Sequence, residues 1–373
     1  MTDNADLEIF LVTHPGVEST LATEAKALGF STPRSVLGGV TVQGGWPEVW
    51  RANLELRGAT RVLVRLGAFR VMHLAQLDKR ARKFPWSGTL RKDVPVRVEV
   101  TCKGSKIYHA GAAAQRIETA IREELGAPIS PDAELCIKAR IEDDLCTISV
   151  DTSGESLHKR GHKEAIGKAP MRETLASLFL RQCGFDGALP VFDPMCGSGT
   201  FVIEAAEMAA GLKPGRARHF AFEQLATFDA AAWSHMNTAA HLVVPSSRFY
   251  GSERDAGAIR MSRANAKRAG VEAITRFRQC GINEIAPPEG PPGLVIVNPP
   301  YGTRIGEKKQ LYGLYGALGK VLMSRFSGWR VAMITTDASL AKASGLPFGP
   351  PSPPVAHGGL RVYLYQTDDL KAG

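Results

Sequence analysis

A strand-like run that ends in an acid and turns through glycines into a helix is the strongest constraint on the fold of this 373-residue chain. Residues 193–200 read DPMCGSGT, directly after apolar residues and directly before a helical pattern over residues 200–210. Glycines at positions 197 and 199 permit a tight turn and close approach of a ligand to the backbone. The start of the helix adds free amides and a positive dipole. The motif predicts an α/β unit with a ligand site where the strand ends.

The glycine spacing separates two ligands that such a turn could bind. Its amides could bind the carboxylate of S-adenosylmethionine or the pyrophosphate of a dinucleotide. A dinucleotide fingerprint requires a third glycine three residues after Gly199, and Val202 stands there. The motif therefore favours S-adenosylmethionine, although a glycine pair alone is more often only a structural turn.

Residues after the next two expected strands would bind the rest of that cofactor. Glu253, followed by Arg254, is placed to accept hydrogen bonds from ribose hydroxyls. Asp255 is instead expected to cap the following helix. Many methyltransferases carry an acid after the next strand to bind the adenine amine, whereas this chain has Gly281 there. The partner of the adenine is therefore not predicted.

A second motif, Asn298-Pro299-Pro300-Tyr301, follows the apolar run 294–297 and predicts catalysis on an amino group. The amine of a base is a poor nucleophile, because its lone pair is delocalised into the ring. The Asn298 side-chain oxygen and the Pro299 carbonyl could accept its hydrogens and direct the lone pair towards a methyl donor. The prolines fix the backbone, and Tyr301 could stack on the base, a contact worth about 1–3 kcal/mol. Asn-Pro pairs also mark ordinary turns, so the upstream motif is needed to favour this reading.

From residue 171 onwards, apolar strand candidates alternate with helices, which is typical of a doubly wound sheet. We expect strands at residues 191–193, 249–252, 277–280, 294–297, 331–335 and 362–365. We expect helices at residues 172–183, 200–210, 256–269 and 311–325.

Two smaller α/β units are expected before this region. The first combines strands at 7–12 and 40–42, helices at 16–28 and 48–56, and an extended segment at 61–66. The second combines a strand at 94–100, a helix at 110–125 and a hairpin of 134–141 with 145–150. Between its strand and helix lies a loop with basic, hydroxyl and aromatic side chains that suit phosphate and sugar contacts, or that simply face solvent.

Composition narrows the class of protein and its surroundings. The net charge of +9 is a weak indication of nucleic acid. The six cysteines lack CxxC spacing, which favours reduced thiols and argues against a zinc site. No apolar run is long enough for a transmembrane helix, and the acidic start argues against a signal peptide. We therefore expect a cytoplasmic protein without a metal, and nothing demands more than a monomer.

The two motifs, the tract 222–233 (FEQLATFDAAAW), residues 251–255 and NPPYGTRIG at 298–306 resemble the THUMP-domain guanine-N2 RNA methyltransferases. The resemblance covers nearly the whole chain and is strongest to the N-terminal module of the bacterial large-subunit rRNA enzyme and to related tRNA enzymes. The connector LHKRGH at 157–162 and the helix entry APMRET at 169–174 also resemble that family.

The resemblance implies a ferredoxin-like domain at 1–66, a THUMP domain at 67–152, a linker at 153–170 and a class I, Rossmann-like methyltransferase domain at 171–373. It implies a seven-stranded sheet in that last domain, with residues 362–365 as an antiparallel seventh strand. Catalysis would fall to Asn298, Pro299, Pro300 and Tyr301. The implied cofactor-binding residues are Pro170, Glu173, Thr174, Asp193, Pro194, Cys196, Gly197, Gly199, Thr200, Glu253, Arg254 and Asn298. The implied RNA contacts are Lys103, Ser105, Lys106, Tyr108 and His109, with Arg160 of the connector as a further candidate.

The expected activity is therefore transfer of a methyl group from S-adenosylmethionine to the N2 amine of a guanosine in rRNA or tRNA. One alternative keeps the chemistry but changes the target to adenine N6, because the second motif fits either amine. Another is an RNA-binding protein whose methyltransferase domain is vestigial. Cys196 is expected to be a small packing residue and not a nucleophile.

Overall fold

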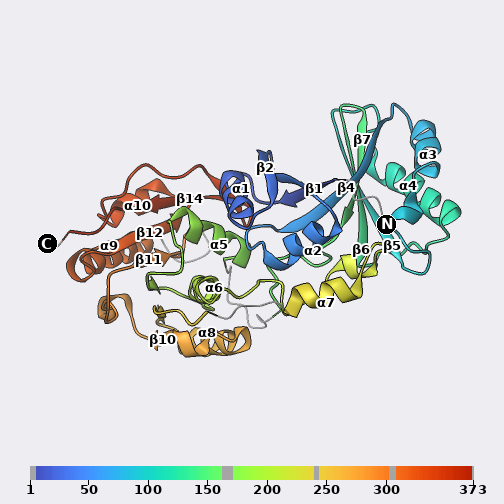
Figure 1. Ribbon diagram of the computed structural model, residues 1–373. Coiled ribbons are helices and arrows are strands. Elements are labelled where there is room, and N and C mark those ends of the chain that lie inside the picture. The colour runs from blue at the N-terminus through green and yellow to red at the C-terminus, as the bar shows by residue number, and fades with distance from the viewer. Residues whose placement is uncertain (1–5, 162–170, 239–242, 302–307, 372–373) are drawn as a thin grey trace. The chain divides into compact units, whose positions relative to one another are not determined.

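A computed structural model describes residues 6–161, 171–238, 243–301 and 308–371 (Figure 1). Their contacts divide the chain into two compact units. Unit 1 comprises Met1–Thr13, Leu21–Leu157 and Arg218–Ala239, and unit 2 comprises His14–Thr20, His158–Ala217 and Ala240–Gly373. No helix in the described ranges is long and apolar enough to cross a bilayer.

The first part of unit 1 is an antiparallel layer with strand order β2-β3-β1-β4. Alternation places Ile9, Leu11, Val40 and Val42 in the core, as half-buried strands require. The strands are β1 (Leu7–Val12), β2 (Ser31–Val36), β3 (Gly39–Gly44) and β4 (Arg61–Arg70), and the helices are α1 (Glu18–Ala27) and α2 (Trp46–Glu55).

Strand β4 continues this sheet into the second part of the unit, in the order β4-β7-β6-β5. The strands there are β5 (Val96–Lys103), β6 (Leu135–Glu142) and β7 (Leu145–Asp151). Helices α3 (Leu74–Arg82) and α4 (Ala110–Glu124) lie side by side in Figure 1. The expected boundary after residue 66 therefore falls inside one strand.

The tract 222–233, expected to lie inside the methyltransferase domain at 171–373, groups with unit 1 instead. Phe222 stacks on Trp50 at 6.2 Å between ring centroids and meets Trp233 edge-on at 5.0 Å. Trp233 lies on α7 (Ala230–Thr238), which contacts α2. Burial of these aromatic rings explains why the segment follows unit 1, so the region 171–373 does not form one continuous unit.

Unit 2 holds a sheet in the order β10-β9-β8-β11-β12-β14-β13. Strand β14 is antiparallel to β12, which confirms the expected antiparallel strand, and β13 is antiparallel to β14. The strands are β8 (Val191–Asp193), β9 (Phe249–Glu253), β10 (Thr275–Gln279), β11 (Leu294–Val297), β12 (Arg330–Thr335), β13 (Val355–His357) and β14 (Leu360–Gln366). The helices are α5 (Glu173–Gln182), α6 (Thr200–Ala209), α8 (Ala256–Ala269), α9 (Lys308–Arg325) and α10 (Ala338–Ala343).

The parallel strands of unit 2 all end at one edge of the sheet, here called the carboxyl edge. Asp193 pairs with Gly251, and Val297 pairs with Met333, so the segments after β8, β9, β11 and β12 emerge together. Thr335 pairs with Tyr363, so the turn between β13 and β14 lies at this edge as well. Ligands of open α/β sheets bind outside the carboxyl ends of the strands.

Candidate functional site

The glycine turn leaves β8 at the carboxyl edge and enters α6. Gly197 and Gly199 have φ values of +52° and +88°, in the region that favours glycine. A Cβ at Gly199 would come within 3.2 Å of Ile203 and Phe277, whereas a Cβ at Gly197 would meet nothing within 4 Å. Gly199 is therefore required by backbone and packing together, and Gly197 borders open space that a ligand could fill.

Side chains from β9 and α8 hold this turn in place. Ser262 Oγ donates to the Gly197 carbonyl at 2.8 Å, and Asn265 Nδ2 donates to the Ser198 carbonyl at 3.1 Å. Ser252 Oγ donates to the carbonyl of the turn's proline, Pro194, at 3.2 Å. Sequence reasoning missed these three residues. Polar residues at 262 and 265, one helical turn apart in an otherwise ordinary amphipathic helix, were the available signal.

Asp193 lies almost completely buried at the base of the turn, with 3% exposure. Its Oδ1 accepts from the Met195 amide at 3.0 Å. Burial raises the pKa of its carboxyl to about 8, and the neighbouring Glu253 pushes the pKa in the same direction. A cationic ligand at this position would favour the ionised carboxylate.

Cys196 is a packing residue, as expected. Its Cβ and Sγ lie 3.0 Å from the position that a Cβ on Gly251 would take. Burial raises the pKa of its thiol, so the reactive thiolate is disfavoured.

Three acids at or after the ends of β9 and β10 each accept a hydrogen bond from a backbone amide. Asp255 Oδ1 accepts from the Ala258 amide at 2.7 Å and caps α8, as expected. Glu253 Oε1 accepts from the Arg254 amide at 2.9 Å at the end of β9. After β10, the exposed Glu284 accepts from the Gly281 amide at 3.2 Å. Glu284 was not predicted, because the expected acid was placed at the strand end; its capping spacing to Gly281 was the signal.

The Asn-Pro-Pro-Tyr motif leaves β11, next to β8, at the same edge. The Asn298 side-chain oxygen Oδ1 is buried without a hydrogen-bond partner among the described residues. Tyr301 lies beside it, and burial raises the pKa of the phenol to about 12, with the Asn298 side chain acting in the opposite direction. A buried acceptor without a donor is costly, which indicates that a ligand with N–H groups belongs there.

Tyr315, on α9, contacts this motif through its hydroxyl. This residue of α9 is completely buried, and its hydroxyl lies 3.3 Å from the Pro300 carbonyl oxygen and 3.1 Å from Thr335 Oγ1 on β12. Because a carbonyl oxygen can only accept, the Tyr315 hydroxyl donates its hydrogen to the Pro300 carbonyl. Sequence reasoning missed both Tyr315 and Thr335, since an aromatic residue in an apolar helix predicts only packing.

The start of α5 contributes two further candidates. Glu173 and Thr174 are buried, and Thr174 Oγ1 has no hydrogen-bond partner within the described ranges. Pro170 lies outside the described residues. Since α5 leads into the amino end of β8, its first turn lies towards the carboxyl edge. Together with the open space at Gly197, the Thr174 oxygen, which lacks a partner among the described residues, fits a cofactor that carries amino and hydroxyl donors.

The loop of unit 1 expected to contact RNA uses some of its polar groups internally. Ser105 Oγ donates to the Lys103 carbonyl at 2.9 Å and accepts from the Asp144 amide at 3.1 Å. His109 Nδ1 accepts from the Ala112 amide at 2.9 Å and caps α4. Ser105 and His109 therefore shape the loop and the helix start.

Other side chains of this loop face solvent. Tyr108 is 85% exposed, and Lys106 is exposed as well. The Lys103 ammonium lies 3.1 Å from a Glu142 carboxylate oxygen, but 74% of its side chain is exposed. These are the groups of the loop that remain available to an RNA backbone or base.

The expectation that Arg160 contacts RNA is wrong. Its guanidinium pairs with Glu204 of α6 at 3.0 Å, and each of the two side chains is only 1% exposed. A guanidinium enclosed in the protein cannot reach a phosphate. The connector therefore contributes Arg160 to the core of unit 2.

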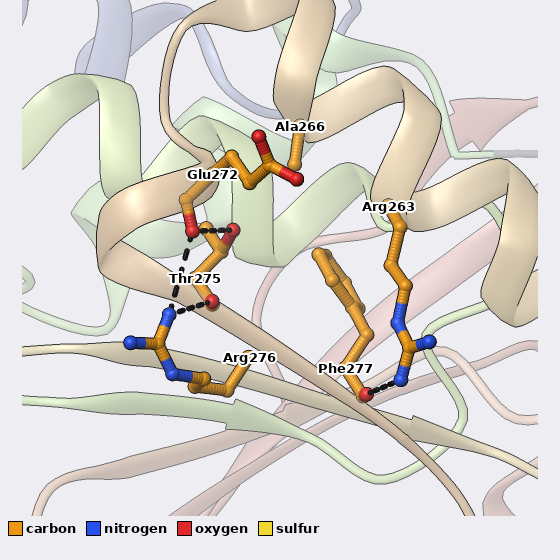
Figure 2. A pocket seen from close by; sticks show the side chains of 6 residues that line it. All are labelled: Arg263, Ala266, Glu272, Thr275, Arg276 and Phe277. Carbon is orange, nitrogen blue, oxygen red and sulfur yellow. Dashed lines mark hydrogen bonds between the residues drawn. The ribbon is translucent and has the colours of Figure 1, made fainter.

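A separate pocket lies where α8 meets β10 (Figure 2). Both arginines that line it already bond backbone carbonyls: Arg263 donates to Phe277 at 2.8 Å and Arg276 to Thr275 at 2.7 Å. In Figure 2 the Glu272 carboxylate points towards Ala266, while the Glu272 carbonyl accepts from Arg276 at 3.4 Å. These arginines are committed to the local backbone, so this pocket is not the candidate site.

Fold and turn together define a class I methyltransferase domain attached to an α+β unit. The chain belongs to the family described as "RMKL-like, methyltransferase domain", whose model matches residues 160–347. The model of the RlmL ferredoxin-like domain matches residues 8–63, which confirms the expected ferredoxin-like part. Membership in this methyltransferase family also confirms the expected cofactor, S-adenosylmethionine.

Individual proteins agree with this family. The chain is 33% identical over 358 residues to the ribosomal RNA large subunit methyltransferase K/L of Psychromonas ingrahamii, covering 92% of this chain but only 48% of that protein. It resembles a possible methylase of Clostridium difficile 630 with a TM-score of 0.89, 28% identity and 99% coverage of both chains. It also resembles a predicted N6-adenine-specific DNA methylase of Listeria monocytogenes str. 4b F2365, with a TM-score of 0.84, 27% identity and coverage of 97% and 96%.

Proposed function

We propose that the chain transfers a methyl group from S-adenosylmethionine to the N2 amine of a guanosine in rRNA or tRNA. The observation that carries this proposal is the buried Asn298 Oδ1, which has no hydrogen-bond partner among the described residues and lies at the same sheet edge as the glycine turn. An amine with two N–H groups satisfies such an acceptor and becomes a better nucleophile as it does so.

Each part of the site has a role in this reaction. S-adenosylmethionine supplies an electrophilic methyl group on a sulfonium. The turn around Gly197, together with Asp193 at its base and Thr174 at the start of α5, binds the cofactor. Asn298 and the Pro299 carbonyl accept the hydrogens of the target amine, and Tyr301 stacks on the base. The amine loses a proton to solvent after transfer, so no strong general base is required.

RNA is favoured as the substrate by unit 1 and by the charge. The net charge of +9 attracts phosphates, and the exposed Lys103, Lys106 and Tyr108 offer backbone and stacking contacts. We propose that residues 67–152 act as a THUMP domain. The relative of Psychromonas ingrahamii is named for ribosomal RNA, although the chain spans about half of that protein. Six free thiols fit a reducing cytoplasm.

Adenine N6 is the second candidate target, because Asn298 and Pro299 would serve that amine equally well. The relative of Listeria monocytogenes is named for this reaction on DNA. A vestigial domain that only binds RNA is disfavoured, because Asn298 Oδ1 has no partner within the described ranges, and leaving this buried acceptor unused would cost about 1–3 kcal/mol.

The test is a methyl-transfer assay followed by nucleoside mass spectrometry. The protein would receive labelled S-adenosylmethionine with tRNA, with large-subunit rRNA, or with DNA, each from cells that lack the gene. N2-methylguanosine in either RNA supports the proposal. N6-methyladenosine would replace the guanine assignment, and cofactor binding without any transfer would support the binding-protein alternative.

A further inference from the structure

Three basic side chains of unit 2 gather from segments that are distant in sequence. His14 lies in the loop after β1, Arg172 is the N-cap of α5, and His357 ends β13. Arg172 and His357 both lower the pKa of His14, and Arg172 lowers the pKa of His357, in each case in addition to burial. Side chains influence one another in this way only when they lie close together.

The loop that carries His14 is seated directly on β13. Gly16 has a φ of +101°, and a Cβ there would fall 2.4 Å from the Pro354 carbonyl oxygen and 3.4 Å from the Val355 side chain. Glycine is therefore required at this contact, because both the backbone angle and the space exclude a side chain. This packing fixes His14 next to the strand that ends in His357.

Each imidazole of the cluster has a buried nitrogen that no described residue satisfies. His14 Nε2 and His357 Nδ1 are both buried atoms without hydrogen-bond partners among the described residues. The charged neighbour that affects both rings is the cation Arg172, whose side chain is exposed. The nearby Glu18 directs Oε2 to the Gly16 amide at 2.8 Å. A guanidinium and two imidazoles that the described residues leave without partners are the set of groups that an anion would complete.

The position of the cluster indicates whether the cofactor or the substrate would supply this anion. His357 precedes the turn between β13 and β14, which lies at the carboxyl edge, and Arg172 directly precedes Glu173 and Thr174. The glycine turn follows β8 and Glu253 ends β9, whereas β14 and β13 lie on the other side of β11. The cluster is therefore on the side of Asn298 away from Glu253, where the proposed function places the substrate.

We propose that Arg172, His14 and His357 bind a backbone phosphate of the RNA strand that carries the target base. This inference rests on the proposed function. Arg172 supplies the charge, and each imidazole donates an N–H from the nitrogen that has no partner in the described part of the chain. A phosphate held at this edge would place the neighbouring nucleotide over Asn298, so the site would position substrate and not take part in the chemistry.

The test replaces both imidazoles and then restores only their donors. In His14→Phe/His357→Leu the shape is largely kept and the donors are lost. In His14→Gln/His357→Asn an amide takes the place of Nε2 and of Nδ1. Three quantities would be measured for each variant. Steady-state kinetics with the substrate RNA give kcat and KM, and titration gives the cofactor affinity. Fluorescence anisotropy with a labelled single-stranded RNA gives the RNA affinity. His219→Asn, on a side chain of unit 1 that is 95% exposed, is the matched control.

For the donor-free variant we expect the KM for RNA to rise about five- to tenfold, with kcat and cofactor affinity nearly unchanged. The Gln/Asn variant should recover most of this loss, and the control should show none. Arg172→Gln should lower the slope of log affinity against log salt by about one. An unchanged KM in the donor-free variant, or no recovery with Gln and Asn, would overturn the proposal.

A second readout separates this site from the proposed function. The imidazole ¹⁵N resonances of His14 and His357 would be followed while inorganic phosphate or the single-stranded RNA is added. Shifts with RNA at concentrations where inorganic phosphate has little effect support an RNA phosphate. Shifts with inorganic phosphate alone, together with an unchanged KM, would make this a small-anion site. Absence of methyl transfer by the unmodified chain would instead contradict the proposed function, whichever shifts are observed.

Discussion

The hydroxyl of Tyr315 lies 3.3 Å from the carbonyl oxygen of Pro300. This contact joins the buried face of α9 to the centre of the Asn-Pro-Pro-Tyr motif. Thr335, at the end of β12, lies 3.1 Å from the same hydroxyl and accepts from the Asp337 amide at 3.4 Å. The loop that presents Asn298 is thus held by the strand next to its own.

Removing this hydroxyl should reduce catalysis without weakening cofactor binding. In Tyr315→Phe we expect kcat to fall about tenfold, because one hydrogen bond of about 1–1.5 kcal/mol no longer holds the loop. Methyl transfer and calorimetric cofactor titration measure the two effects. Tyr312→Phe, an exposed tyrosine on the same helix, is the control. Equal losses in the two variants would contradict a positioning role for Tyr315.

Truncating the asparagine should be far more severe. Asn298→Ala removes an acceptor that acts directly on the target amine, so we expect kcat to fall about 10²–10³-fold. Cofactor affinity should stay within about threefold of the unmodified value, because the turn around Gly197 is untouched. Asn283→Ala, at an exposed position of the same unit, controls for the substitution itself. Retained turnover in Asn298→Ala would refute the role of the acceptor.

The carboxyl of Asp193 should make the cofactor-free protein less stable as pH rises. Its pKa is about 8 in the fold against 3.8 in the unfolded chain, so between these values the folded state holds a proton that the unfolded state has lost. Stability from this group is full below about pH 4 and is lost as pH passes about 8.

Thermal melts of Asp193→Asn and of the unmodified chain across that range would test this effect. The difference in Tm, variant minus unmodified chain, should grow with pH. The comparison matters because the lowered pKa values of His14 and His357 act oppositely, reducing stability below about pH 6.5. Asp368→Asn, at an exposed position, should show a constant difference.

The exposed lysines of unit 1 should contribute to RNA affinity through counterion release. For Lys103→Ala/Lys106→Ala we expect weaker binding and a salt slope reduced by up to about two. Fluorescence anisotropy over a range of salt concentrations measures both quantities. Lys138→Ala, on β6, removes a lysine that pairs with Glu99 and serves as the control. If the slope is the same in both variants, the RNA contacts lie elsewhere.

Arg160 should matter for stability and not for RNA. Arg160→Met leaves the Glu204 carboxylate buried without its guanidinium, which should destabilise the fold by about 3–5 kcal/mol. Arg160→Met/Glu204→Leu should recover most of that stability, because no buried charge remains. Chemical denaturation measures both. A stable single variant with a lower salt slope for RNA would restore the original expectation.

Much of unit 2 was predictable because its signals are local. The strands at 191–193 and 294–297 and the helix at 256–269 match the expected bounds, since each is a short apolar or amphipathic run with a clear turn or cap beside it. Strand β2 was missed because its residues are mostly exposed and form no alternating pattern. Helix α7 was missed because only Trp233 among its residues is buried, so the segment has no apolar face to detect.

The site was predictable where one motif contains both backbone and chemistry, as at Gly197 and Asn298. Contacts between motifs were not predictable. Ser262, Asn265 and Tyr315 reach the motifs from helices whose registers the sequence does not fix. Arg160 was predicted to be accessible to RNA, because it is a basic residue in a basic connector. It is buried instead, because it pairs with Glu204 of α6.

Strand β4 also determines where the polypeptide can be divided. It pairs with β1 through Arg61–Arg65 and with β7 from Leu63 to Arg70. A fragment that stopped at residue 66 would keep the first ladder but end its last strand halfway along the second, leaving an open edge able to recruit other chains. The match to the ferredoxin-like domain ends at residue 63, within β4, so we expect a fragment cut at that border to expose a strand edge and to aggregate.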